Sequence, residues 1–128
     1  MIALDTSSLA AYLSNDAGGD VDAVEVALVE RQACLPPAVL AELLSDPKLP
    51  ARTAALFRAL PRLAITEGYW ERVGALRAEV IAQGRKARLA DALIAQSCLD
   101  HGVPLITRDT DFRNFSRVRD LQLVLPKA

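Results

Sequence analysis

The sequence lacks several features that would assign it to a broad class of protein. Its two cysteines, Cys34 and Cys98, are far apart and form no CxxC pair, so we expect free thiols in a reducing cytosol. No apolar stretch approaches the length of a membrane span. The N-terminus has neither a basic region nor a cleavage site, so we expect no signal peptide and a cytoplasmic protein.

The chain also lacks an excess of positive charge. Its formal net charge is −1, and the pI is about 5.8. A global field that attracts nucleic acid is therefore excluded, and any such contact must come from a local patch or from metal ions.

Apolar residues, in contrast, are abundant. They make up 52% of the 128 residues, and the mean hydropathy is +0.19. This length predicts one domain over residues 1–128 with one real core. The high apolar content favours a dimer or a bound protein partner. A parallel sheet covered by helices, which is apolar in any case, remains an alternative explanation.

Short apolar runs alternate with helical periods along the whole chain, which predicts a parallel sheet with helices on both faces. The runs that read as strands are residues 2–4, 33–35, 63–65, 103–107 and 121–125. The helical segments are residues 7–13, 21–32, 37–45, 50–60 and 89–101, with a long helix that Thr66 caps and that runs to about Gln83. In that long helix we expect the following side chains to face inward: Tyr69, Val73, Leu76, Val80 and Ile81.

Four acidic residues stand where burial makes a carboxylate costly. Asp5 follows the apolar run 2–4, and Asp109 lies just beyond the run 105–107. Glu42 interrupts an apolar helical stretch, and Asp91 lies in the first turn of an apolar helix. A chain keeps such acids mainly when a cation offsets the desolvation cost. In a parallel sheet Asp5 and Asp109 share the carboxyl edge, where ligands bind in folds of this class.

Carboxylates are the side chains that Mg²⁺ and Mn²⁺ prefer, whereas histidine and thiolate favour softer metals. One such ion can activate water and polarise a phosphate, and two can clamp both the attacking and the leaving oxygen. Acids that converge without a metal repel one another, so at least one should have a raised pKa.

Each acid also has an ordinary structural interpretation. Asp5 can cap the first helix, and Glu42 can be a solvated helix residue. Asp91 suits the dipole of a helix N-terminus, and Asp109 and Asp111 suit a turn. The arrangement of all of them, and no single acid, favours a metal site.

Four segments of the sequence resemble motifs of the PIN-domain nucleases, and most closely those of VapC-type toxins. They are MIALDTSSL (residues 1–9), PAVLAELL (37–44), LADALIA (89–95) and LITRDTDF (105–112). The segments span nearly the whole chain in the order and spacing of the family. The resemblance implies a three-layer α/β/α fold with a central twisted, mostly parallel sheet of four to five strands.

The resemblance also implies an endoribonuclease that depends on Mg²⁺ or Mn²⁺, often as a homodimer. The residues it places in the acidic site are Asp5, Glu42, Asp91 and Asp109, with Asp111 as an auxiliary ligand and Thr107 and Ser7 as supporting hydroxyls. The cations expected to bind RNA phosphates are Arg85, Lys86 and Arg88 of one loop, together with Arg108. Arg108 is next to Asp109, so we also expect it to neutralise the acids. The alternative for the loop of Arg85, Lys86 and Arg88 is that its charged side chains are only solvated and bind no RNA.

Our hypothesis is therefore the toxin of a toxin–antitoxin pair, whose antitoxin inserts a helix into an apolar groove and places a cation among the acids. Tyr12, Leu13, Leu56 and Leu60 are candidates for that groove or for a dimer contact. The alternatives are a PIN nuclease of RNA processing and a catalytically inactive PIN-like binding module. A receiver-like phosphotransferase is disfavoured, because no lysine follows a later strand before Lys127. We expect Trp70 to be a packing residue.

Overall fold

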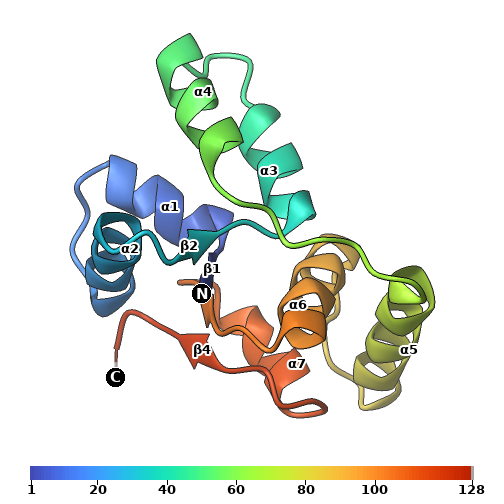
Figure 1. The fold of residues 1–128 in the computed structure, drawn as a ribbon. Helices are drawn as coiled ribbons and strands as arrows, with labels where there is room; N and C mark the ends of the chain where they lie inside the picture. Colours follow the sequence, from blue (N-terminus) through green and yellow to red (C-terminus); the bar gives the residue numbers. More distant parts are fainter. Residues whose placement is uncertain (128) are drawn as a thin grey trace.

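A small parallel sheet lies at the centre of the molecule (Figure 1). The computed structural model describes residues 1–127, and within them four strands pair in the order β2-β1-β3-β4. They are β1 (Ile2–Leu4), β2 (Ala33–Cys34), β3 (Leu105–Ile106) and β4 (Leu123–Val124). All neighbouring strands are parallel. Ala3 is aligned with Cys34 on one side and with Leu105 on the other.

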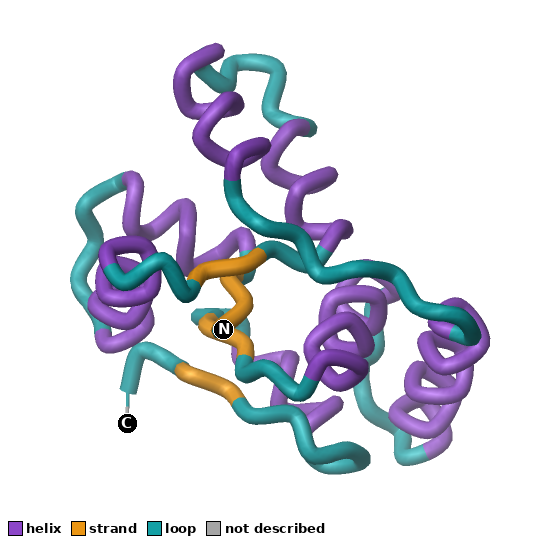
Figure 2. The backbone as a smooth tube through the Cα atoms, viewed as in Figure 1, coloured by secondary structure: helices purple, strands orange, loops and turns teal. Residues whose placement is uncertain are grey.

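Helices cover the sheet from two sides, which makes the three-layer α/β/α arrangement that we expected. In Figure 2 the strands are enclosed between two groups of helices. One group holds α1 (Thr6–Leu13) and α2 (Gly19–Val29). The other holds α5 (Tyr69–Ala82), α6 (Leu89–His101), the 3₁₀ helix η1 (Thr110–Phe112) and α7 (Arg113–Ser116).

The helices α3 (Pro37–Leu44) and α4 (Ala51–Ala59) pack against each other and project beyond the sheet (Figure 1). Pro37 takes the first helical position of α3, where its missing N–H costs nothing. α3 also packs against α6. A residue on α3 can therefore lie close to residues of α6.

The core is continuous from the sheet into both helical layers. Ala3, Leu4, Leu105 and Ile106 are fully buried, as parallel strands covered on both faces require. Among the largest buried side chains are Phe112 and Phe115, Leu35, Leu76 and Ile94. No helix within residues 1–127 has the length and hydropathy needed to span a bilayer.

The expected strand at residues 63–65 is wrong. Leu35 forms a single parallel bridge with Arg62, in which the Leu35 N–H donates to Pro61 and the Leu63 N–H donates to Leu35. The pairing does not extend along residues 63–65, because the next donor on the opposite segment would be Pro37, which has no N–H, and because Ile65 is 48% exposed.

The start of α5 also differs from the expectation. Its N-cap is Gly68, whose φ of +82° is left-handed, and no side chain caps the helix. Thr66 instead accepts a hydrogen bond from the Arg72 guanidinium at 2.9 Å.

The inward face of α5 agrees with the expectation at four of five positions. Tyr69, Val73, Leu76 and Val80 are buried, but Ile81 is 48% exposed. Trp70, which we expected to be a packing residue, is 61% exposed. It contacts Tyr69 edge to face, with 5.0 Å between ring centroids. Trp70 and Ile81 are about three helical turns apart and so share the outer face of α5.

This assignment of faces predicts a contrast between two substitutions in α5. Leu76→Ala should lower the free energy of unfolding by about 2–5 kcal/mol, because it leaves a cavity in the core. Ile81→Ala should change it by less than about 1 kcal/mol, since the side chain is largely solvated. Urea denaturation of both variants measures the contrast. Equal losses would contradict the placement of Ile81.

Candidate metal centre

The carboxyl ends of β1 and β3 bring two of the four acids together. Asp5 directly follows β1, and its backbone N–H donates to the carbonyl of Ile106 at 2.9 Å. Thr107 follows β3, and Asp109 lies two residues further on. The side chain of Asp5 is almost fully buried, whereas Asp109 is partly buried.

Two hydroxyl groups hold the Asp5 carboxylate. Ser7 Oγ and Thr107 Oγ1 each donate to Oδ2 of Asp5 at 2.7 Å. Thr107 is fully buried, and its oxygen also accepts from the backbone N–H of Asp109 at 3.0 Å. Thr107 therefore links the first acid to the fourth. Asp5 occupies the N-cap position of α1, but its side chain makes no capping hydrogen bond, so the helix-capping interpretation is wrong.

Glu42 reaches the site from α3. It is an exposed residue, and Oε1 accepts a hydrogen bond from Thr6 Oγ1 at 2.9 Å. This contact joins the first residue of α1 to the middle of α3. Sequence reasoning missed Thr6 as a partner of Glu42, because the two residues meet only through the packing of these helices.

Asp91 lies in the first turn of α6, and its pKa is affected by the charges of the other three acids. Its pKa is raised from 3.8 to about 6, chiefly by burial and then by the negative charges of Asp109 and Asp5. Arg88 opposes the shift, and Glu42 adds to it. The four acids are thus coupled electrostatically, and the raised pKa that we expected of one converging acid is found at Asp91.

Asp109 and Asp111 form the rim of the site. One oxygen of Asp109, Oδ1, accepts from the backbone N–H of Asp111 at 2.9 Å and caps η1. The turn interpretation therefore holds for that oxygen. Asp111 Oδ2 lies 3.3 Å from Nζ of Lys86, and both side chains are well exposed.

The chemistry of these side chains fits a hard divalent cation. Asp5, Glu42 and Asp109 each use one carboxylate oxygen in the hydrogen bonds above. None of the hydrogen bonds found within residues 1–127 engages the second oxygen of these acids or either oxygen of Asp91. In such an arrangement one oxygen of the carboxylate is held by a hydrogen bond, and the other oxygen is left to bind a metal ion.

Softer ligands do not take part in this cluster. His101 lies at the far end of α6 and contacts the carbonyl of Ala64, and both cysteines are buried thiols. As the side chains stand, no three acidic, histidine or cysteine residues within residues 1–127 are arranged to ligate one ion.

Comparisons with known proteins agree with this geometry. The family model of the PIN domain matches residues 2–118. The chain belongs to the PIN domain family. No curated protein matches the sequence.

Three solved structures with the same fold are similar to this chain. FitAcB from Neisseria gonorrhoeae is 20% identical with a TM-score of 0.71, covering 98% of each chain. VapBC-5, from a toxin–antitoxin family in Mycobacterium tuberculosis, is 22% identical with a TM-score of 0.67, covering 97% of each chain. VapBC2 from Rickettsia felis, bound to a promoter DNA fragment, is 22% identical with a TM-score of 0.72, covering 98% of each chain.

The basic loop of this PIN domain lies beside the acids. Arg85, Lys86 and Arg88 are exposed. Arg88 is close enough to Asp91 to oppose the rise in its pKa, and Lys86 pairs with Asp111.

Arg108 is placed differently from the expectation. Its guanidinium donates to both carboxylate oxygens of Asp20, each at 2.8 Å, and to the carbonyl of Ala17 at 3.0 Å. The expectation that Arg108 neutralises the acids of the site is therefore wrong. Sequence reasoning missed Asp20 and its partner Ser8, because an acid in the first turn of a helix is common and gives no sign of burial.

The raised pKa of Asp91 predicts how stability depends on pH. The native state binds the proton of the Asp91 carboxyl group more tightly than the unfolded chain does. Protonated Asp91 therefore adds to the free energy of unfolding below about pH 4, and this contribution is lost as the pH rises through about 6. Asp91→Asn stays neutral. It should be about 1–2 kcal/mol more stable than the wild type at pH 7, with solvent screening included, and equal to it near pH 4.

Urea denaturation at the two pH values measures this difference. The exposed acid of α2, Asp22, supplies a matched control, since Asp22→Asn removes a carboxylate that has no such partners. An Asp91→Asn effect of the same size at both pH values would contradict the coupling.

Proposed function

We propose that this PIN domain is a divalent-metal-dependent endoribonuclease and the toxin of a toxin–antitoxin pair. One observation carries the nuclease proposal: carboxylates that follow β1 and β3 and that project from α3 and α6 lie near enough for Asp109, Asp5 and Glu42 to add to the rise that burial causes in the pKa of Asp91. Hydrolysis of a phosphodiester bond by a metal needs such a cluster of hard oxygen ligands.

The proposed ligands of Mg²⁺ or Mn²⁺ are Asp5, Glu42, Asp91 and Asp109, with Asp111 as an auxiliary acid. When bound, the cation lowers the pKa of water and stabilises negative charge that develops on the phosphate. Ser7 and Thr107 fix Oδ2 of Asp5 and so direct Oδ1 toward the site. Thr6 does the same for Glu42 by holding Oε1.

RNA binding falls to the basic loop at the start of α6. Because the whole chain carries a net charge of −1, phosphate must be attracted locally. Arg85, Lys86 and Arg88 supply that charge next to the acids, and Lys86 is held at the rim by Asp111. Arg108 has no part in this proposal, since its guanidinium is engaged by Asp20.

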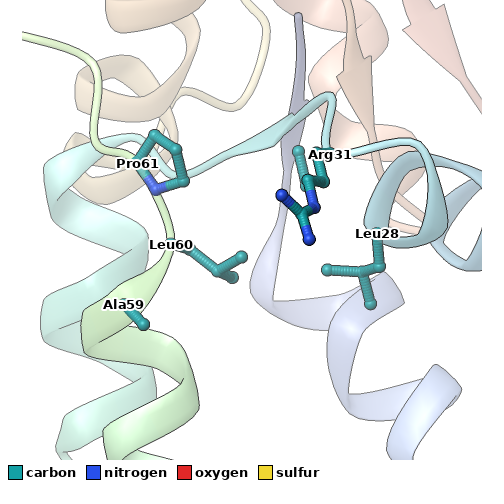
Figure 3. A pocket seen from close by; sticks show the side chains of 6 residues that line it. Leu28, Arg31, Ala59, Leu60 and Pro61 are labelled. Carbon is teal, nitrogen blue, oxygen red and sulfur yellow. The ribbon is translucent and has the colours of Figure 1, made fainter.

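An apolar groove supports the antitoxin partner. A pocket of about 230 Å³ lies between α1, α2 and α4 and is lined by Leu9, Tyr12, Leu13, Leu28, Leu56, Phe57 and Leu60. Leu28 and Leu60 also line the neighbouring pocket, shown in Figure 3 with Arg31, Ala59 and Pro61. Leu13 is 50% and Leu56 62% exposed, so an amphipathic helix could bury both.

The names of the similar structures favour the same kind of partner, because VapBC-5 belongs to a toxin–antitoxin family. The exposed apolar residues on α5, which include Trp70 and Ile81, are the surface we assign to a homodimer.

The nuclease proposal predicts cleavage of RNA that requires both metal and Asp5. Purified protein should cut a pool of structured RNA with Mg²⁺ or Mn²⁺ and not with EDTA. Asp5→Asn should reduce the rate by about 100-fold or more, because it removes a ligand charge from the metal site. Asp22→Asn, the same chemical change on an exposed residue, should cleave like the wild type.

Equal cleavage by the wild type and the Asp5→Asn variant would overturn the proposed site. Absence of cleavage by every variant, together with absence of Mn²⁺ binding, would favour an inactive PIN-like binding module. Cleavage by a protein for which no antitoxin partner is found would favour an RNA-processing nuclease.

The antitoxin proposal predicts that one substitution in the groove weakens a complex. The wild-type chain, co-expressed with the product of the adjacent gene, should copurify with it. Leu56→Asp should abolish copurification because it buries a charge in the interface. Val29→Asp should not, since Val29 is 71% exposed and lines neither pocket. Equal retention by both variants would contradict the assigned groove.

A further inference from the structure

An ion pair between a buried carboxylate and a partly exposed arginine lies next to the acidic site. Asp20, in the first turn of α2, is fully buried, and Arg108 donates to it through Nε and Nη2 at 2.8 Å each. Ser8 Oγ adds a third hydrogen bond at 2.8 Å. Burial of a carboxylate is costly unless it is paired in this way. The Arg108 guanidinium, more than any other group, lowers the pKa of Asp20 to about 2, so the pair is charged throughout the physiological range.

The backbone of Arg108 belongs to the acidic site, although its side chain does not. Residue 108 stands between Thr107, which donates to Asp5, and Asp109. The backbone N–H of Arg108 donates to Ser7 Oγ at 3.1 Å, and that hydroxyl also donates to Asp5. Arg108 is therefore anchored on one side by Asp20 and contacts the partners of Asp5 on the other.

Two adjacent serines of α1 divide these tasks. Ser7 contacts Asp5 and the backbone of Arg108, whereas Ser8 contacts Asp20. Gly18 leaves the space that the pair occupies. A Cβ at this position would lie 2.5 Å from Oδ1 of Asp20 and 2.8 Å from Nη2 of Arg108. The start of α1, the start of α2 and the turn after β3 are thus joined around one carboxylate.

We propose that Asp20 is a positioning residue of the acidic site: through Arg108 it fixes the turn of residues 107–109 so that Thr107 and Asp109 stand correctly beside Asp5. The inference rests on the proposed function, since the acids need this spacing to share a divalent cation. Asp20 itself touches neither metal nor RNA.

A second arginine–aspartate pair supplies a matched control. Arg72 donates to Asp100 through Nε at 2.9 Å and Nη2 at 2.7 Å, and Gln96 adds a hydrogen bond. The side chain of Asp100 is 9% exposed, compared with 0% for Asp20. Asp100 lies near the end of α6, at the opposite end of that helix from Asp91. Asp100→Asn therefore disturbs a pair of the same geometry remote from the acids.

The experiment compares Asp20→Asn, Asp100→Asn and the wild type with two measurements, after thermal melting has shown that each is folded. The first is amide hydrogen exchange of Arg108 and Asp109 without metal. Asp20→Asn should speed exchange of both amides by about tenfold or more, because the turn opens more often. The second is Mn²⁺ affinity by calorimetry, which Asp20→Asn should weaken by about 10–100-fold, as loss of an orienting partner does. Asp100→Asn should change neither.

Two results would overturn the proposal: wild-type exchange at both amides in Asp20→Asn, or equal loss of Mn²⁺ affinity in the two variants. If the wild type itself binds no Mn²⁺, the proposed function fails, and the exchange rates alone decide whether Asp20 holds the turn. If Asp20→Asn does not fold, Ser8→Ala removes one hydrogen bond from Asp20. It should produce the same pattern with a smaller loss, within about tenfold.

Discussion

Repulsion among four carboxylates is the constraint on which the arrangement of the site depends. Asp5, Glu42, Asp91 and Asp109 come from four separate segments of the chain, and burial together with the charges of the other three acids raises the pKa of Asp91 to about 6. Like charges held in a partly buried site disfavour their own ionisation, so the fold must supply the free energy that keeps them together. The parallel sheet supplies it, since β1 and β3 end side by side at residues that are fully buried.

Hydrogen bonds from hydroxyl groups stabilise two of these carboxylates, Asp5 and Glu42, in spite of this repulsion. Thr6, Ser7 and Thr107 each donate to an acid and carry no charge themselves, so they orient the carboxylates without neutralising them. A lysine or arginine in the same positions would offset the negative potential that attracts a cation. Arg108, which is adjacent to Asp109 in the sequence, is instead held by Asp20 outside the cluster. Basic side chains remain at the rim, where Lys86 pairs with Asp111 and Arg88 lies near Asp91, and these are the residues to which we assign phosphate binding in the proposed function.

The sequence predicted the fold and indicated the candidate acids because both have local signals. Alternation of apolar runs and helical periods gives the parallel sheet, and Asp5 and Glu42 stand out because they interrupt apolar segments. The strand at 63–65 was wrong because a short apolar run has the same pattern whether or not a strand lies beside it. The predicted inward orientation of Ile81 was wrong because α5 carries apolar residues on its outer face as well.

The contacts that orient the acids have no local signal. Asp20 and Arg108 are 88 positions apart, and Thr6 and Glu42 are 36 positions apart. The packing of α2 against β3 brings the first pair together, and the packing of α1 against α3 brings the second pair together. Thr107 was found through its resemblance to a family motif, whereas its hydrogen bond to Asp5 crosses between two strands and is evident only in the fold.

The most direct test of a shared cation site is a carbon-13 NMR titration of the Asp91 carboxyl group, with and without Mg²⁺. Without the ion the carboxyl should titrate at about 6. With Mg²⁺ its pKa should fall below the ordinary value for aspartate, because the cation replaces repulsion with attraction. A pKa that stays near 6 at saturating Mg²⁺ would contradict the account, and so would an ordinary pKa in the protein without metal.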